Sequence, residues 1–379
     1  MGNPFYLQEV PVDAPFCDRT REMKELQSYA EAKANVVLFS PRRYGKTSLI
    51  KRVQKRLADH GAISLFADFF GVASVEDVAA RLAKAVFALT HNQEPLWKTA
   101  MKAIRSFRPV LKPDPSGGIN LSVEPSSAGK SGLALLEETL ESLGEFVTRA
   151  GKLVQISLDE FQEVSALREA LQIEGIMRTC IQRHQASYCF VGSRRRILLA
   201  IFNERQRPFF QSAINYPLRP LPPLELAEFI AEQFKGSRRK CSLKMARQLA
   251  ARAEHHPYYS QKLAFFVYEI SRVVTEEAIQ QAMEKLIASE KPVFEAIIQG
   301  LPLHQRLLLR ALSLEPVQKL LSSSYIHKHG LGSVGGVQHS VRQLEELDLI
   351  QKDEEAGFWR LVDPMFGKWM KNQAEEKLD

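Results

Sequence analysis

Cysteine is scarce in this chain, and long apolar runs are missing. The four cysteines, Cys17, Cys180, Cys189 and Cys241, lie far apart and form no CxxC pair. This spacing indicates neither a disulfide framework nor a zinc site, so we expect a reducing, cytoplasmic environment. No apolar stretch approaches the roughly 18 residues of a membrane span, and the N-terminus shows no charged segment followed by an apolar run. We therefore predict no signal peptide and no membrane partner.

The composition is that of a folded globular protein with an excess of positive charge. Of the 379 residues, 45% are hydrophobic and 25% are charged, which is enough apolar material for two or three domains. The net charge of +7 favours an acidic partner such as nucleic acid, but lysines scattered over solvated faces give the same total.

Continuous apolar runs alternate with amphipathic helical patterns over residues 1–221. The strand-like runs are residues 36–40, 62–70, 153–160, 187–193 and 213–221. Strands that are apolar on both faces, separated by helices, indicate a parallel sheet covered on both sides. Between the second and third runs, residues 108–127 are rich in Pro, Gly and Ser. This insertion fits either a hairpin or ordered loop, or a flexible linker.

The remainder of the chain follows a different pattern. Over residues 222–299 apolar side chains occur only at helical spacing, which predicts an all-α domain. Residues 300–379 contain two helices, a third helix ending in LEELDLI, a turn and an aromatic strand, the order of a winged helix-turn-helix. We therefore predict three domains: an α/β domain at 1–221, a helical domain at 222–299 and a winged helix at 300–379.

The stretch NVVLFSPRRYGKTSLIKRV, residues 35–53, has the features of a phosphate-binding loop between a strand and a helix. Gly45 allows a tight turn, Lys46 can reach the β- and γ-phosphates, and Thr47 can hold Mg²⁺. Ser40 stands where such a loop usually has glycine, and its small side chain still allows phosphate to approach. The predicted nucleotide-binding residues are Ser40, Pro41, Arg42, Arg43, Tyr44, Gly45, Lys46, Thr47 and Ser48.

A second motif, LVQISLDEF, places two acids at the end of a buried strand. Asp159 is predicted to hold Mg²⁺ with Thr47, and Glu160 to orient or deprotonate the attacking water. Ser193 ends the next strand, where it can sense the γ-phosphate, although a lone serine there is also a common turn former or helix cap. The predicted catalytic residues are Lys46, Glu160 and Ser193.

Together these motifs resemble the archaeal ATPase family, also called ATPase domain type 2, in the STAND-like branch of the AAA+ superfamily. The resemblance covers nearly the whole chain. It is carried by PFCDRTREMKEL, SPRRYGKTSLI, SLDEFQEV, FVGS, EHHPYYSQKLA and GFWRLVDPMFGKW. It implies an α/β P-loop NTPase of AAA+ (ASCE) type, an all-α lid and a C-terminal winged helix, with ATP or ADP and Mg²⁺ as ligands.

The resemblance also assigns residues outside the loop. Phe16 and Arg19 would lie beside the adenine and ribose, and His256 with Pro257 would close the adenine side from the lid. Without the resemblance, HHPYY is simply a helix start with proline in its first turn.

One departure concerns hydrolysis. The family commonly has PLYGR after the sensor strand, and its arginine is a candidate finger for the transition state. This chain has PFFQS at 208–212, with Ser212 in the place of that arginine. An arginine finger is worth about 10³–10⁵ in rate. We therefore expect slow hydrolysis, unless Arg205, Arg207 or one of residues 194–196 substitutes, within the chain or from a neighbouring subunit of a homo-oligomer.

Three functional hypotheses follow. The first is an ATP-dependent switch. Its winged helix would be an intramolecular or protein-contact module and not a reader of DNA sequence, because the helix at 333–349 has one arginine and three acids. The second is a DNA-binding loader similar to initiator or transposition-regulator ATPases. For such a loader, the binding surface would be the basic segment 235–252, or 178–219 with its eight arginines. Either segment fits a subunit interface or solvated face as well. The third is a hydrolysis-deficient protein that keeps nucleotide for structural reasons.

Overall fold

The computed structural model describes residues 2–90, 94–113, 119–126, 129–353 and 357–375. The chain forms two compact units, which are described one at a time. The α/β unit comprises Arg19–Ser40 and Lys46–Leu218. The helical unit comprises Met1–Asp18, Pro41–Gly45 and Arg219–Asp379.

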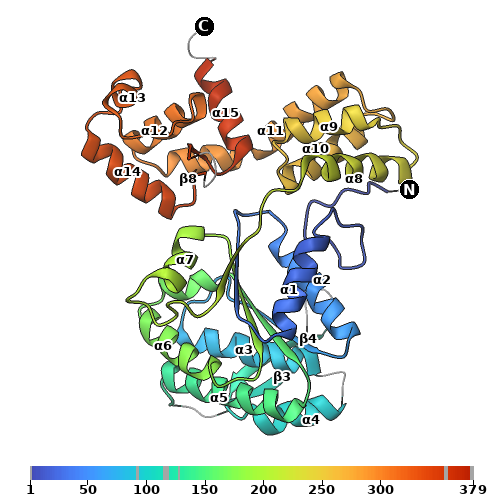
Figure 1. Ribbon diagram of the computed structural model, residues 1–379, viewed down its shortest axis with the longest axis vertical. Helices are drawn as coiled ribbons and strands as arrows, with labels where there is room; N and C mark the ends of the chain where they lie inside the picture. The colour runs from blue at the N-terminus through green and yellow to red at the C-terminus, as the bar shows by residue number, and fades with distance from the viewer. Residues whose placement is uncertain (1, 91–93, 114–118, 127–128, 354–356, 376–379) are drawn as a thin grey trace. The chain divides into compact units, whose positions relative to one another are not determined.

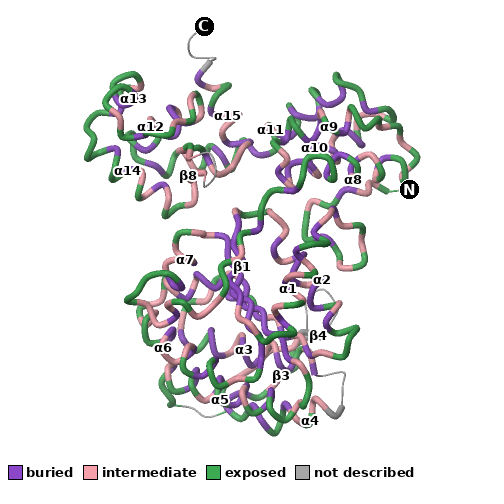
Figure 2. The backbone as a smooth tube through the Cα atoms, in the orientation of Figure 1, coloured by how far each residue is buried: buried purple, intermediate pink, exposed green. Residues whose placement is uncertain are grey.

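The α/β unit is built on a five-stranded parallel sheet (Figure 1). Its strands, in the order β2-β5-β6-β1-β7, are β2 Ile63–Asp68, β5 Val154–Asp159, β6 Ser187–Gly192, β1 Val36–Phe39 and β7 Ile214–Pro217. Every residue of β1, β5 and β6 is buried, and Figure 2 shows β1 in purple. Burial on both faces is the reason these strands are continuously apolar in sequence. The predicted parallel α/β fold is confirmed.

Helices pack around this sheet. They are α1 Thr20–Glu31, α2 Lys46–Asp59, α3 Val75–Thr90, α4 Glu94–Ala103, α5 Gly132–Ala150, the 3₁₀ helix η1 Phe161–Ala166, α6 Ala170–Ile181 and α7 Arg195–Asn203. Four buried phenylalanines, Phe161, Phe190, Phe202 and Phe209, pack with ring centroids 4.8–5.9 Å apart. Phe161 directly follows Glu160, so this aromatic cluster supports the end of β5.

The insertion between α4 and α5 is a hairpin. Strands β3 Phe107–Pro113 and β4 Ile119–Pro125 pair antiparallel and pack against α3. The sequence left open a hairpin or ordered loop on the one hand and a flexible linker on the other, and the structure shows paired strands. Residues 114–118, between the two strands, lie outside the described residues.

The helical unit contains two groups of elements around one continuous hydrophobic cluster. The first group is α8 Pro223–Gly236, α9 Leu243–Arg252, α10 Pro257–Ile270 and α11 Glu276–Gln299. The second is α12 Leu303–Leu314, α13 Ser323–Lys328, α14 Val334–Glu346, β8 Ile350–Lys352, β9 Trp359–Leu361 and α15 Pro364–Glu375. Strands β8 and β9 pair antiparallel and form the wing. The domain boundaries at residues 221 and 299 stay predictions.

The N-terminal segment packs on the helical unit. The ring of Phe5 lies 5.0 Å from that of Phe234 in α8, and Asn3 donates a hydrogen bond to the carbonyl of Phe265 in α10. Sequence reasoning had no signal for this packing, because residues 2–18 carry no periodic pattern. Over the described part of the chain, no helix combines the length and the apolar character needed to cross a membrane.

Candidate functional site

The loop between β1 and α2 contains two residues with positive φ. Gly45 has φ +83° and Arg43 has φ 64°, both in the left-handed region, where glycine is favoured. Ser40 is not among the described residues with positive φ, so its side chain causes no backbone strain. Helix α2 begins at Lys46, the residue that directly follows Gly45 in the chain.

The ammonium of Lys46 is held at the start of this loop. Lys46 is 6% exposed, and its Nζ donates to the carbonyl oxygen of Ser40 at 3.0 Å and to its hydroxyl at 3.4 Å. Ser48, also buried, lies in the first turn of α2, and its carbonyl accepts from Arg52 at 3.3 Å. A buried ammonium beside a helix N-terminus is an electrostatic environment suited to phosphate.

Thr47 and Asp159 meet at the edge of the sheet. The Thr47 hydroxyl donates to Oδ2 of Asp159 at 2.7 Å, while Oδ1 accepts from the amide of Glu160 at 3.0 Å. Burial raises the pKa of the Asp159 carboxyl, and the hydrogen bond from Thr47 opposes that shift. A hydroxyl and a carboxylate side by side supply the oxygen ligands that Mg²⁺ prefers when it also binds phosphate and water. The residues present therefore fit this metal.

Glu160 is fixed by its neighbours in a strained conformation. Its φ is 49°, and its Oε2 accepts hydrogen bonds from the Ser193 hydroxyl at 3.0 Å and from Nε2 of Gln162. Ser193 and Gln162 are almost fully buried. A strained backbone at a functional residue persists only where the surrounding contacts hold that residue in place. The two donors here hold the carboxylate in one orientation.

Gln162 is a site residue that the sequence reasoning missed. A Cβ atom on Gly192, at the end of β6, would overlap Oε1 of Gln162, so this glycine leaves the space that the glutamine occupies. The signal was present in the motif DEFQ, where a polar residue falls two positions after Glu160. Its contact with residue 192, however, depends on the strand order.

Six predicted residues therefore converge in the α/β unit. They are Ser40, Lys46, Thr47, Asp159, Glu160 and Ser193, which lie at the carboxyl ends of the neighbouring strands β1, β6 and β5. Ligands of open α/β sheets bind at this edge. Arg19 is also in this unit, buried at the start of α1 with its Nη1 2.7 Å from Oε1 of Glu22. Its predicted place beside the ribose stays a prediction.

The arginines that could replace the missing finger differ in their surroundings. Arg207 forms an ion pair with the buried Glu174 and donates to the Ser165 hydroxyl at 3.0 Å. Burial raises the pKa of Glu174 to about 7, and Arg207 opposes the shift. Ser212 donates to the carbonyl of Phe209 at 2.6 Å. Arg205 is exposed and makes no ion pair among the described residues. Arg207 thus has a structural role, which leaves Arg205 as the freer candidate.

Arg194 and Arg195 are partly engaged as well. Arg194 lies 3.9 Å from Oε1 of Glu163, and the Arg195 guanidinium lies 5.6 Å from the centre of the Phe39 ring. Both of these contacts are long.

The remaining predicted residues belong to the helical unit. His256 caps α10 by accepting from the amide of Tyr259 at 3.4 Å, and its ring centroid lies 4.8 Å from that of Tyr44. Pro257 is the first residue of α10. Phe16 and Pro41 are half-buried, and Arg42 is exposed. The roles of Phe16, His256 and Pro257 at an adenine stay predictions.

Arg43 of the loop contacts two helices of the helical unit. Its guanidinium lies 4.4 Å from the centre of the Tyr258 ring, and its Nη1 is 3.4 Å from Oε2 of Glu290 in α11. Glu290 is buried and also accepts from Nζ of Lys262 at 2.6 Å. Like Tyr44, Arg43 therefore contacts helices of its own unit.

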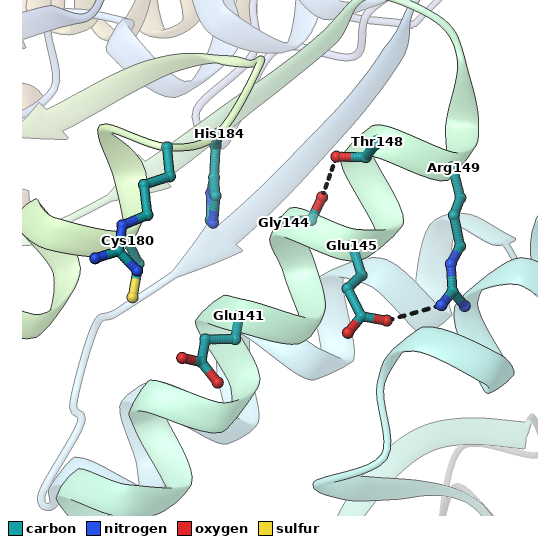
Figure 3. A pocket seen from close by; sticks show the side chains of 8 residues that line it. Glu141, Gly144, Glu145, Thr148, Arg149, Cys180 and His184 are labelled. Atoms are coloured by element: carbon teal, nitrogen blue, oxygen red, sulfur yellow. Dashed lines mark hydrogen bonds and ion pairs between the residues drawn. The ribbon is translucent and has the colours of Figure 1, made fainter.

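A separate pocket of about 430 Å³ lies between α5 and α6 (Figure 3). Its lining includes Glu141, Gly144, Cys180 and His184 and none of the predicted nucleotide residues. Burial lowers the pKa of His184 to about 4. Its Nδ1 lies 2.6 Å from the Tyr188 hydroxyl. The histidine is therefore neutral at pH 7, and its contacts indicate a packing role.

Comparisons with known proteins agree with this architecture. Residues 16–193 match a family described as an ATPase domain predominantly from Archaea, and residues 292–372 match a probable winged helix domain. No curated protein sequence matches the chain.

Three solved structures are similar over nearly their whole length. A Walker-type ATPase of Pyrococcus abyssi has a TM-score of 0.71 at 14% identity, covering 97% of this chain and 99% of its own. The ORC2 protein of Aeropyrum pernix, in ADPNP–ADP complexes, has 0.58 at 13% identity, covering 97% and 98%. The ORC1 protein of Aeropyrum pernix in complex with DNA has 0.53 at 15% identity, covering 98% and 97%. At these identities the similarity shows the fold, which is the predicted P-loop NTPase with a C-terminal winged helix.

Proposed function

We propose that the protein is a switch that binds Mg-ATP and hydrolyses it slowly, because residues 16–193 match a family described as an ATPase domain predominantly from Archaea. The observation that carries this proposal is the hydrogen bond between Thr47 and Asp159, two oxygen ligands brought together beside the buried Lys46. Mg²⁺ use, the STAND-like branch and a cytoplasmic location are parts of the proposal.

Nucleotide binding is assigned to the loop and the start of α2. The loop amides and the N-terminal end of α2 bind the phosphates, and the Lys46 ammonium exchanges its contacts with Ser40 for phosphate oxygens. Thr47 and Asp159 would hold Mg²⁺, which supplies charge neutralisation at the β- and γ-phosphates. The burial of Asp159 excludes bulk water from this carboxylate.

Hydrolysis is assigned to Glu160. Its carboxylate accepts the proton, or orients the lone pair, of the water that attacks the γ-phosphorus. Ser193 and Gln162 fix the carboxylate, and Ser193 is placed where it can also contact the γ-phosphate. The reaction is slow because Ser212 replaces the finger and Arg207 is paired with Glu174.

The switch is assigned to contacts within the helical unit. Arg43 and Tyr44 of the loop touch Tyr258, Glu290 and His256, and the Tyr259 hydroxyl donates to Oδ2 of Asp363 at 2.5 Å. Asp363 immediately precedes α15 of the winged helix. A change in the loop on nucleotide binding therefore has a packed path to the winged helix, which we propose contacts a protein partner.

The test compares nucleotide binding and turnover of Glu160→Gln with the wild type. We expect fluorescent-ATP affinity within about threefold and an ATPase rate at least a hundredfold lower, because the amide cannot accept the proton. Glu169→Gln, the same change at the residue that precedes α6, is the matched control and should keep its rate. An unchanged rate in Glu160→Gln would instead support the hydrolysis-deficient hypothesis.

A further inference from the structure

Exposed positive charge is concentrated on one part of the helical unit. The residues, here called the basic surface, come from the end of α8, the α8–α9 connection, the exposed face of α9 and the α10–α11 connection. They are Lys235, Arg238, Lys240, Lys244, Arg247 and Arg272, all exposed.

The two connections that carry this charge are held together by backbone hydrogen bonds. The amide of Lys240 donates to the carbonyl of Arg272 at 3.0 Å, and the amide of Val274 donates to the carbonyl of Lys240 at 2.8 Å. Between them Arg239 donates to the carbonyl of Ser271 at 2.7 Å, and its guanidinium lies 3.9 Å from the centre of the Tyr268 ring. The two connections, which carry Arg238, Lys240 and Arg272 and lie more than 30 residues apart in sequence, are therefore fixed relative to one another.

The basic surface is not neutralised from within the unit. None of its six side chains forms an ion pair in the described part of the chain. The two acids in the first turn of α11 have other contacts. Glu276 lines a groove with Arg252 and Lys368, and Glu277 is hydrogen-bonded to Thr275. Glu232, one turn before Lys235 on α8, is the acid at its margin. On α9, Lys244 and Arg247 share one exposed face, while Ala246, Leu249 and Ala250 are buried on the opposite face.

We propose that the basic surface binds the phosphodiester backbone of a nucleic acid. Six like charges held together repel one another, and a polyanion relieves that repulsion and releases its own counterions on binding. The charges are spread over two connections and a helix face, so they suit an extended polyanion better than a single phosphate. The recognition helix α14 is the weaker candidate, because its segment carries three acids and one arginine.

This inference goes beyond the proposed ATPase function, since it names a partner and a surface that use no residue of the nucleotide site. It is also the structural feature that bears on the DNA-loader hypothesis. Because the contacts are to the backbone, we expect binding to be salt-dependent and indifferent to base sequence.

The test uses the full chain and fluorescein-labelled 20-nucleotide DNA of mixed sequence, as duplex and as single strand, at 50–300 mM KCl with and without ATP. Each lost phosphate contact reduces the slope of log affinity against log salt by about 0.9 for duplex DNA. For Lys240→Glu/Lys244→Glu we therefore expect duplex binding at least tenfold weaker and a slope shallower by about 2. Lys240→Gln/Lys244→Gln should show a smaller loss in the same direction.

The matched control is Lys102→Glu/Lys152→Glu, which makes the same change in net charge at two exposed lysines of the α/β unit. It should bind within about twofold of the wild type. Circular-dichroism melting and the ATPase rate should be unchanged in all variants. The melting curve shows whether a variant is unfolded, and the ATPase rate tests the proposed function independently of DNA binding. The proposal is overturned if the wild type binds neither DNA at 50 mM KCl, if the control weakens as much as the test variant, or if polyglutamate competes as well as duplex DNA.

Discussion

The hydroxyl of Thr47 lies 2.7 Å from Oδ2 of Asp159, although 112 residues separate them in sequence. Thr47 is on the first turn of α2 and Asp159 is the last residue of β5, so the sheet order places a metal-binding hydroxyl against a buried carboxylate. A single cation can bind both oxygens in place of the hydrogen bond that joins them. This relationship leads to the first prediction.

Thr47→Ala should weaken Mg-ATP binding and leave metal-free binding of ADP nearly unchanged. The hydroxyl supplies a metal ligand, whereas the phosphates are bound by the loop amides and Lys46. We expect at least a tenfold loss of Mg-ATP affinity by titration calorimetry, against less than threefold for ADP in EDTA. Thr47→Ser, which keeps the hydroxyl, is the control and should retain affinity. Equal losses with and without Mg²⁺ would show that Thr47 does not hold the metal.

Gly192→Ala should reduce hydrolysis by displacing Gln162. The added Cβ would overlap Oε1 of Gln162 and lie 3.0 Å from Cδ2 of Leu198, so the glutamine must leave Glu160. We expect an ATPase rate at least tenfold lower and a free energy of unfolding lower by about 1–3 kcal/mol, the usual cost of overpacking. Both are measurable by a coupled phosphate assay and urea denaturation.

A double variant tests whether the rate falls because Gln162 no longer contacts Glu160. Gly192→Ala/Gln162→Ala removes the overlapping side chain and should recover most of the stability, yet its rate should remain low because one donor to Glu160 is missing. Recovery of the full rate would contradict a positioning role for Gln162.

Arg207→Ala should destabilise the protein far more than Arg205→Ala. Removing Arg207 leaves the buried Glu174 without its partner, and breaking a pair of this kind costs on the order of 3 kcal/mol. Arg205 is exposed, so its replacement should change the unfolding free energy by less than about 0.5 kcal/mol. Urea denaturation at pH 8 measures both. Similar values for the two variants would mean that the Glu174 pair has no structural role.

The P-loop and the Asp159–Glu160 pair could be predicted because each is a local pattern with its own physical reason. The hydrogen bond from Gln162 to Glu160 was not predicted, since its place depends on the space left by Gly192 on another strand. The pairing of Arg207 with Glu174 was not predicted either, because the two residues lie 33 positions apart in sequence and only the fold brings them together. Sequence patterns show which side chains have the required chemistry, and the strand order decides which of them meet.

The packing of the N-terminal segment could not be predicted from the sequence for a different reason. Phe5 is buried against Phe234, but nothing within residues 2–18 indicates which element covers it. The hairpin at 107–125 was similarly undecided, because proline and glycine are typical of linkers as well as of turns. The contact that decides the place of Phe5 comes from a residue far away in the sequence, whereas the hairpin is decided by pairing between neighbouring segments and by packing on α3.

His184 should make the protein less stable as the pH falls from about 7 to about 4. Burial lowers its pKa from an ordinary 6.5 to about 4, so in this range the unfolded chain binds a proton that the folded protein excludes. Its contribution, at most about 3 kcal/mol, is therefore present above pH 6.5 and lost as the pH falls through the folded pKa. Urea denaturation at pH 7.5, 6.0 and 5.0 should show a steeper decline for the wild type than for His184→Gln, which has no proton to gain. Parallel declines would show that His184 does not titrate as its burial predicts.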